Sequence, residues 1–144
     1  MAADPAWGLL ISIVAIAVIA GVGWWSGRGK TNADDLKAGD CFKAPTAESG
    51  IDSVEHQSCA GTHEAEIYAV VNLPEGSPYP SDDMSAAEVA CGTALDSLTV
   101  ILENIPEDTL DGTLFPDRPQ WGKDRKVLCY ASSATGFPGP IIDR

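Results

Sequence analysis

Three side chains that can bind a metal ion fall within eight positions of one another. His56, Cys59 and His63 follow the spacing H-x2-C-x3-H, and imidazole nitrogen and thiolate sulfur are ligands that zinc prefers. Cys41 or Glu66 could supply the fourth ligand of a tetrahedral site. One interpretation of this segment is therefore a zinc site with His56, Cys59 and His63 as its ligands.

The four cysteines, Cys41, Cys59, Cys91 and Cys129, favour a second interpretation. Their spacings of 18, 32 and 38 residues include no C-x-x-C pair, which disfavours a thiol-redox motif. An even number of cysteines in a small acidic domain is typical of structural disulfides. A bridge from Cys41 to Cys59 would close a small loop across adjacent strands, and one from Cys91 to Cys129 would use the remaining thiols. We expect these two disulfides, no metal and no cofactor, although spacing does not fix the connectivity.

In the sequence, His63 is also close to two carboxylates, Glu64 and Glu66, and these residue types together could form a general-base cluster. Covalent catalysis would need an activated nucleophile, and no Ser or Cys stands in a recognisable nucleophile motif. The sequence contains no glycine-rich phosphate-binding loop. We therefore expect no catalytic residues and no enzymatic activity. We expect His63 to form a hydrogen bond that fixes the turn after Cys59.

A membrane anchor is predicted ahead of these residues. Residues 7–25 carry no charge over 19 positions, and at about 1.5 Å per residue they would form a helix of roughly 28 Å, near the hydrocarbon thickness of a bilayer. Tryptophans stand at both ends of this segment, namely Trp7, Trp24 and Trp25. Indole rings favour the membrane interface. The tail 1–6 has no basic side chain and "GVGWWSG" is a poor cleavage site, so we expect an uncleaved single-pass helix followed by a linker, 26–35.

Flanking charge and cysteine content give opposite indications of topology. Arg28 and Lys30 follow the apolar segment, whereas only Asp4 precedes it, and the positive-inside rule would then place the domain in the cytoplasm. Disulfides persist in oxidising compartments and would place it outside. Two basic residues are a weak orientation signal, so we expect a cell-membrane protein whose C-terminal domain is extracytoplasmic.

The remainder of the chain is strongly acidic. From Thr31 onward it has 20 Asp and Glu against 7 Lys and Arg, a net charge of about −13. Nucleic acid is therefore not an expected partner, because the domain offers little positive charge to displace phosphate counterions. An acidic surface attracts basic partners and also keeps a domain soluble, and the sequence does not decide between these roles.

Short strands and one helix are predicted for the outer domain. A short strand is predicted to begin at 41–42, and further strand patterns occur over 51–59, 63–73 and 126–131. In the last of these, Val127 and Cys129 should share one face, with Leu128 and Tyr130 on the other. The stretch 74–83 is rich in Pro, Gly and Asp and should be an exposed loop.

The helix is predicted over 85–105. Ser85 and Glu88 have the spacing of a capping box, and Pro106 ends the pattern. An apolar stripe at helical spacing follows, made of Cys91, Leu95, Leu98, Leu102 and Ile105. The Cys91 side chain should therefore point into the core and bridge to a neighbouring strand.

The remaining segments lack periodicity. Residues 106–126 are predicted to be an irregular loop, and 132–144 an extended tail. The fold class is α+β, with three or four strands and one helix over 36–131, tethered by the anchor.

Several of these motifs together resemble the actinobacterial septum-formation family domain. They are "AGDCF" at 38–42, "CAGTHEAEIYAVV" at 59–71, an isolated helical Cys91 and "RKVLCY" at 125–130. The resemblance covers roughly 36–131 and implies an extracytoplasmic location, disulfides and no known catalysis. It also marks His63 and Glu66 as candidate interaction residues, to which we add the apolar pair Ile141 and Ile142 of the tail.

These observations lead to one leading expectation of function and two alternatives. We expect a non-catalytic accessory subunit of an actinobacterial envelope membrane complex, with a respiratory cytochrome bc1-aa3 oxidase supercomplex as the specific example. Its partners would be other membrane subunits, through the helix and the acidic domain, and membrane lipid. A septum-formation or wall-associated factor is the second possibility, and a zinc-dependent extracytoplasmic enzyme is the third.

Overall fold

The computed structural model describes residues 30–46 and 53–144. The predicted N-terminal tail, the anchor over 7–25 and residues 26–29 of the predicted linker lie outside the described residues. The rest of the predicted linker, 30–35, is not irregular, because it forms a short strand, β1 (Lys30–Asn32), and the 3-10 turn η1 (Ala33–Asp35). Within the described ranges no helix has the length and apolar character needed to cross a membrane. The chain divides into two units, and the second, Thr31–Arg144, contains the predicted outer domain.

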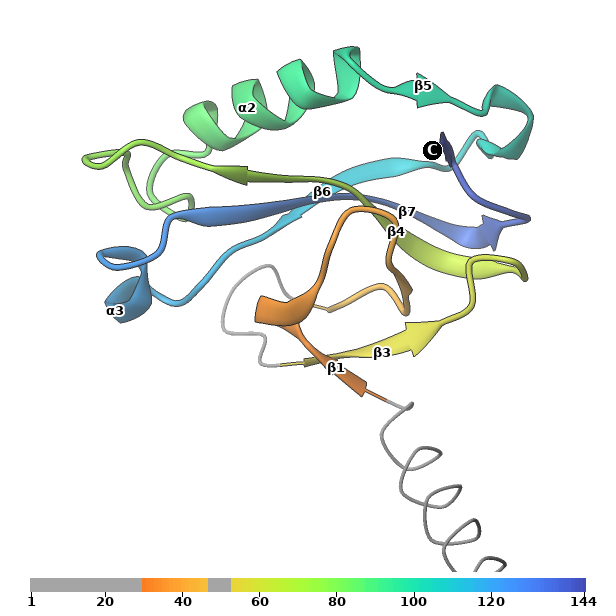
Figure 1. The fold of residues 1–144 in the computed structure, drawn as a ribbon, viewed down its shortest axis with the longest axis horizontal. Helices are drawn as coiled ribbons and strands as arrows, with labels where there is room; N and C mark the ends of the chain where they lie inside the picture. The colour runs from red at the N-terminus through yellow and green to blue at the C-terminus, as the bar shows by residue number, and fades with distance from the viewer. Residues whose placement is uncertain (1–29, 47–52) are drawn as a thin grey trace, which may run out of the picture. The chain divides into compact units, whose positions relative to one another are not determined.

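A six-stranded sheet forms the centre of this unit, in the order β1-β3-β2-β4-β7-β6 (Figure 1). The strands are β1 (Lys30–Asn32), β2 (Cys41–Phe42), β3 (Ser53–Gln57), β4 (His63–Asn72), β6 (Leu110–Leu114) and β7 (Lys126–Phe137). The pairs from β3 across to β6 are antiparallel. The α+β class is confirmed, with more strands than the three or four predicted.

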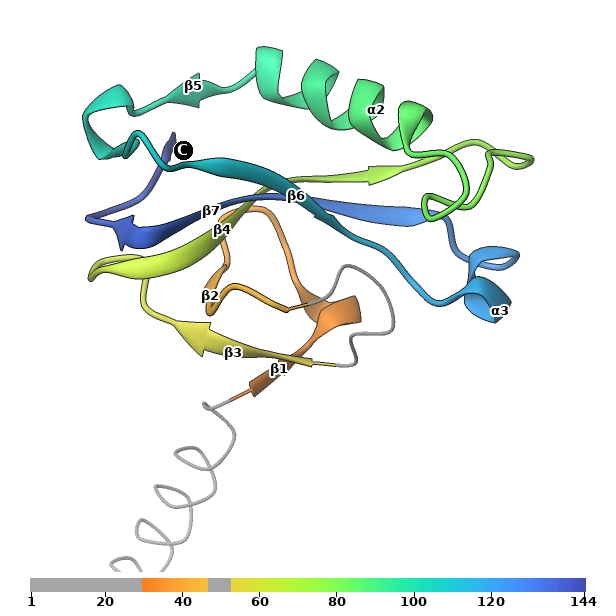
Figure 2. The same cartoon turned by 180° about the vertical axis from the view of Figure 1, so that it is seen from behind.

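The long strands β4 and β7 are covered on both faces. Helix α2 (Ser85–Asp96) lies on one side of them, and the β1–β3–β2 part of the sheet curls beneath the other (Figures 1 and 2). Side chains alternate accordingly: Cys129 faces the core under α2, whereas Leu128 and Tyr130 face a second core with Phe42. The two faces predicted for 126–131 are confirmed. Strands buried on both sides read as near-continuous apolar runs, as residues 67–71 of β4 and 127–131 of β7 do.

Helix α2 begins where predicted but has a different cap and is shorter. Its capping box does not form: Met84 is the N-cap residue, and the Asp83 carboxylate accepts hydrogen bonds from Ser85 N–H at 3.0 Å and from its hydroxyl at 2.5 Å. A carboxylate is a stronger acceptor than a hydroxyl and suits the positive helix N-terminus.

The predicted helix over 85–105 is wrong beyond Asp96. The chain turns at Ser97, forms β5 (Thr99–Val100) and then the 3-10 turn η2 (Leu102–Asn104). Three consecutive β-branched residues, Thr99 to Ile101, favour a strand, and β5 finds a partner in β8 (Ile142–Asp143). Leu102 is consequently 79% exposed, outside the apolar stripe assigned to it.

The segment 106–126 is also more regular than predicted. It contains β6 and the short helix α3 (Arg118–Trp121), which the side chain of Asp117 caps through Gln120 N–H at 3.0 Å. Local periodicity is weak because β6 is defined by pairing with β7 rather than by its own sequence.

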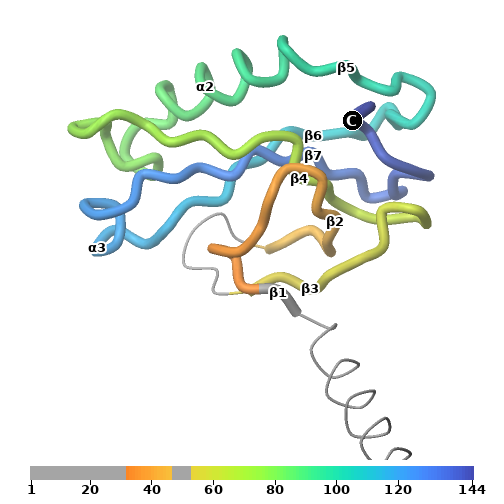
Figure 3. The backbone as a smooth tube through the Cα atoms, in the orientation of Figure 1, coloured from red at the N-terminus to blue at the C-terminus, as the bar shows by residue number. Residues whose placement is uncertain are grey.

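The C-terminal tail is part of the domain. Strand β7 continues through Phe137, and β8 follows after a turn. The C-terminal end of the chain lies near β5, as Figure 3 shows. Ile141 and Ile142 are buried in the core under α2, so their side chains pack inside this domain and are not exposed to a partner. The loop 74–83 is exposed for most of its length, but Tyr79 packs edge-on against Phe115 and Trp121.

Candidate functional site

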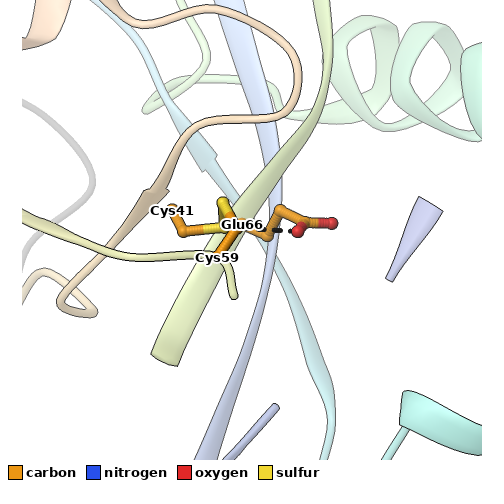
Figure 4. Close-up of side chains that lie close together, drawn as sticks. All are labelled: Cys41, Cys59 and Glu66. Atoms are coloured by element: carbon orange, nitrogen blue, oxygen red, sulfur yellow. Dashed lines mark hydrogen bonds between the residues drawn. A yellow bond between two sulfur atoms is a disulfide. The ribbon is translucent and has the colours of Figure 1, made fainter. Parts of the chain in front are cut away.

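The first candidate site is a disulfide packed against a buried carboxyl group. Cys41 on β2 pairs across the sheet with Glu66 on β4, and this register places both side chains on the same face. Cys59, in the turn between β3 and β4, forms a disulfide with Cys41. Sγ of Cys41 lies 3.2 Å from Oε1 of Glu66, the contact dashed in Figure 4. Because a disulfide has no S–H, this oxygen receives no hydrogen bond from the sulfur.

Glu66 is almost completely enclosed, with 2% of its surface exposed. Its Oε2 accepts a hydrogen bond from Ile141 N–H at 3.0 Å, which ties β4 to the C-terminal segment. Burial raises the pKa of Glu66 above its ordinary value of 4.5. The hydrogen bond from Ile141 N–H, the charge that His63 carries when protonated and the positive charge of Arg144 oppose this pKa increase but do not cancel it.

His63 lies beside the same carboxyl group. Its Nδ1 lies 2.9 Å from the carbonyl oxygen of Gly61, so Nδ1 carries the hydrogen, and the predicted hydrogen bond that fixes the turn after Cys59 is confirmed. Nε2 of His63 lies 3.6 Å from Oε1 of Glu66. This buried nitrogen has no hydrogen-bond partner among the described residues.

The C-terminal residue closes the cluster. Nη2 of Arg144 donates to the carbonyl oxygens of Ile67 and Tyr68, at 3.3 Å each. A Cβ atom at Gly39 would lie 3.2 Å from Nε of Arg144, so this glycine, with φ of +95°, allows the guanidinium to approach. Sγ of Cys59 lies 3.1 Å from the carbonyl oxygen of Gly39. Gly39 thus lies near both the guanidinium group and the disulfide.

The residues predicted as zinc ligands are separated in the structure. His56 is exposed on β3, opposite Phe42, and does not come within mutual ligand distance of Cys59 and His63. Instead, Cys41, Cys59 and Glu66 place one ligand atom each within 4.8 Å of one another. Both sulfurs are committed to the disulfide, so these residues could hold a metal ion only after reduction.

A second disulfide joins the helix to the sheet. Cys91 of α2 points into the core, as predicted, and is bonded to Cys129 of β7. Both of these cysteines are buried. Each bridge therefore has the pairing that the sequence favoured, and no free cysteine remains among the described residues.

A groove between α2 and β6 is the second candidate site. Its volume is about 380 Å³, and its floor includes Tyr68 of β4 and Cys91 of α2. Two exposed carboxylates line it, Glu88 from α2 and Asp111 from β6, and no basic side chain does. Burial and the Asp111 charge raise the pKa of Tyr68 to about 12, so its hydroxyl remains protonated at neutral pH.

The candidate interaction residues of the sequence are internal. His63, Glu66, Ile141 and Ile142 are each at most 3% exposed, so none of them forms an exposed binding surface. Sequence reasoning missed the groove and the part played by Arg144. A cluster assembled across 75 residues leaves no local spacing signal, and the two groove carboxylates come from separate elements.

Comparisons with known proteins identify no relative, because no family model, no curated protein and no solved structure matches the chain.

Proposed function

We propose that this protein is a non-catalytic accessory subunit of an envelope membrane complex, held by its N-terminal apolar segment and binding a basic partner segment through the groove between α2 and β6. The observation that carries the proposal is the pairing of two carboxylates with a partly apolar floor in that groove. An extracytoplasmic location is supported by the two disulfides, which persist in oxidising compartments.

A lysine or arginine side chain matches this groove. Its alkyl stem can lie along Met84 and Leu95, while its charged end reaches Glu88 or Asp111. The Tyr68 hydroxyl, protonated at neutral pH, adds a neutral polar group at the floor. The net charge of the domain, about −13 from Thr31 onward, would accelerate the approach of a basic partner and make binding sensitive to salt.

The test is binding of a lysine-rich peptide to the full chain in detergent, measured by calorimetry at low and physiological salt. Replacing both groove carboxylates, Glu88→Gln with Asp111→Asn, should weaken binding about tenfold, because each lost charge contact is worth up to about 1 kcal/mol at an exposed site. The matched control is Glu75→Gln with Glu107→Gln, which changes net charge equally at exposed positions outside the groove.

Equal weakening by both double variants would assign the effect to net charge alone and overturn the groove as the binding site. The same variants decide the assembly class in native membranes extracted with mild detergent. A stoichiometric partner that copurifies with the wild type and the control, but not with the groove variant, supports an accessory subunit. A chain that copurifies with no partner at stoichiometric yield contradicts the subunit role and favours a transient septum-formation factor.

A further inference from the structure

We propose that the Cys41–Cys59 disulfide is a two-electron redox site that accepts electrons from an external dithiol, with Glu66 as the proton donor to the Cys41 sulfur. This inference is independent of the groove. It rests on the contact of the bridge with Glu66, on the unequal burial of its two cysteines and on the unpartnered Nε2 of His63.

The two sulfurs of this bridge differ in access. Cys59 stands in the turn after β3 and is partly exposed, whereas Cys41 on β2 is 0% exposed. Cys59 is therefore the residue of the bridge that an incoming thiolate can approach, which makes Cys41 the leaving group. A bare thiolate at Cys41 would be buried and costly, so it needs a proton as the S–S bond breaks.

The structure holds that proton donor in place. Oε1 of Glu66 lies 3.2 Å from Sγ of Cys41, and Nε2 of His63 lies 3.6 Å from the same oxygen. Because Nδ1 of His63 bonds to Gly61, Nε2 is the ring nitrogen that faces Glu66, and a proton held by Nε2 or by Oε1 lies near the leaving sulfur. Burial also favours the protonated form of Glu66. After reduction, the Cys41 S–H can donate to Oε1, and the Cys59 S–H to the carbonyl oxygen of Gly39.

The reaction balances in two steps. The first thiolate of the dithiol attacks Sγ of Cys59, an intermolecular S–S bond forms, and the Cys41–Cys59 bond breaks with its electron pair moving to the Cys41 sulfur. The Cys41 sulfur takes the proton from Glu66. The proton that the attacking thiol lost then protonates Glu66 again. The second thiol then displaces Cys59 from the mixed disulfide, and its proton passes to the Cys59 sulfur. The chain gains two thiols, and the dithiol is oxidised to a disulfide.

The test compares the two bridges of the same folded chain. The full-length protein is treated with dithiothreitol, quenched with acid, alkylated and mapped by mass spectrometry over time. The Cys41–Cys59 bridge should open while the domain is folded, and the buried Cys91–Cys129 bridge should not. Glu66→Gln should slow opening of Cys41–Cys59 by about 100-fold, the lower range for loss of a general acid. Glu64→Gln, on the same strand, should leave the rate unchanged.

A second measurement needs no variant. The monothiol 2-mercaptoethanol should form its mixed disulfide on Cys59 and not on Cys41 of the wild-type chain. The proposal is overturned if both bridges open together only when the domain unfolds, if the mixed disulfide forms equally on both cysteines, or if Glu66→Gln and Glu64→Gln open at the same rate. Should Glu66→Gln fail to fold, the position of the mixed disulfide decides.

Discussion

At the scale of single residues, the unusual feature is a carboxyl group buried where its ionised form would have a high free energy. Glu66 is enclosed by a disulfide, an imidazole and the backbone N–H groups of Ile141 and Ile142, and among the described side chains none donates a hydrogen bond to its Oε1. A buried charge without full pairing is costly, whereas a protonated carboxyl group carries no charge and has a hydrogen to offer toward Nε2 of His63, 3.6 Å away. The neutral form of Glu66 is thus the better match for its surroundings, in agreement with the direction of its pKa.

This arrangement predicts how stability depends on pH. Because its pKa is raised in the folded state, Glu66 stabilises the fold fully below its ordinary value of 4.5, and this contribution is lost as pH rises through the raised pKa. The free energy of unfolding of the wild type, minus that of Glu66→Gln, should therefore fall as pH increases above 4.5. Urea unfolding of both proteins across this pH range measures the difference.

Other acidic groups do not obscure this result. Three other carboxyl groups have a lowered pKa because they accept hydrogen bonds: Asp82 from Arg118, Asp83 from Ser85 and Asp108 from Ser133. Their contribution to the stability of the fold is lost as pH falls, which is the opposite direction. They are present in both proteins and cancel in the difference. A difference that is constant with pH, or that rises, would contradict a raised pKa of Glu66 in the folded state.

At the scale of elements, the sequence predicts those parts whose pattern is local and misses those that depend on a distant partner. The strand over 63–73, the start of the helix at Ser85 and the two bridges follow from β-propensity, helical spacing and cysteine arithmetic. Strand β6 and the C-terminal strand β8 do not, because each is defined by pairing with a strand elsewhere in the chain. The candidate site divides in the same way: Cys59, His63 and Glu66 stand in one motif, whereas Ile141 and Arg144 join them only through the fold.

Gly112 provides a test of the β6–β7 pairing. A Cβ atom at this position would lie 2.6 Å from the hydroxyl oxygen of Tyr130 and would overlap its ring, too close for any real contact. Gly112→Ala should therefore destabilise the domain by about 1–3 kcal/mol, as overpacking of a core does. Gly92→Ala is the control, because its Cβ meets no atom within 4 Å and a helical alanine should stabilise by about 0.5–1 kcal/mol. Equal effects of the two substitutions in chemical unfolding would be inconsistent with this packing.

The bridge between α2 and β7 is expected to contribute more than the first bridge. Cys91 and Cys129 are 38 residues apart, against 18 for Cys41 and Cys59. By loop-closure entropy, the double replacement Cys91→Ala with Cys129→Ala should cost about 4 kcal/mol, and Cys41→Ala with Cys59→Ala about 3 kcal/mol. Denaturant titrations of both double variants measure this, and a larger loss at Cys41–Cys59 would show that contacts with Glu66 outweigh chain entropy.

At the scale of the whole domain, the C-terminus is the segment that completes both the core and the site. Residues 138–144 supply β8, two buried isoleucines, the N–H bonded to Glu66 and the guanidinium of Arg144. The segment pairs with β5 and, through Ile141 N–H, bonds to the buried carboxyl group on β4. The same few residues thus contribute to the core and to the site.

Removing residues 138–144 should consequently unfold or severely destabilise the domain. Burial of Ile141 and Ile142 is worth about 1.5–3 kcal/mol each, and the lost N–H bond to a buried carboxyl adds about 1–3 kcal/mol. The sum is comparable with the total stability of a small domain, about 5–15 kcal/mol. Removing Arg144 alone is the matched control and should leave a cooperative transition, because it spares β8 and the Ile141 hydrogen bond. Thermal unfolding followed by circular dichroism distinguishes the two, and a cooperative transition in the longer truncation would show that β4 and β7 form a stable core without the C-terminal segment.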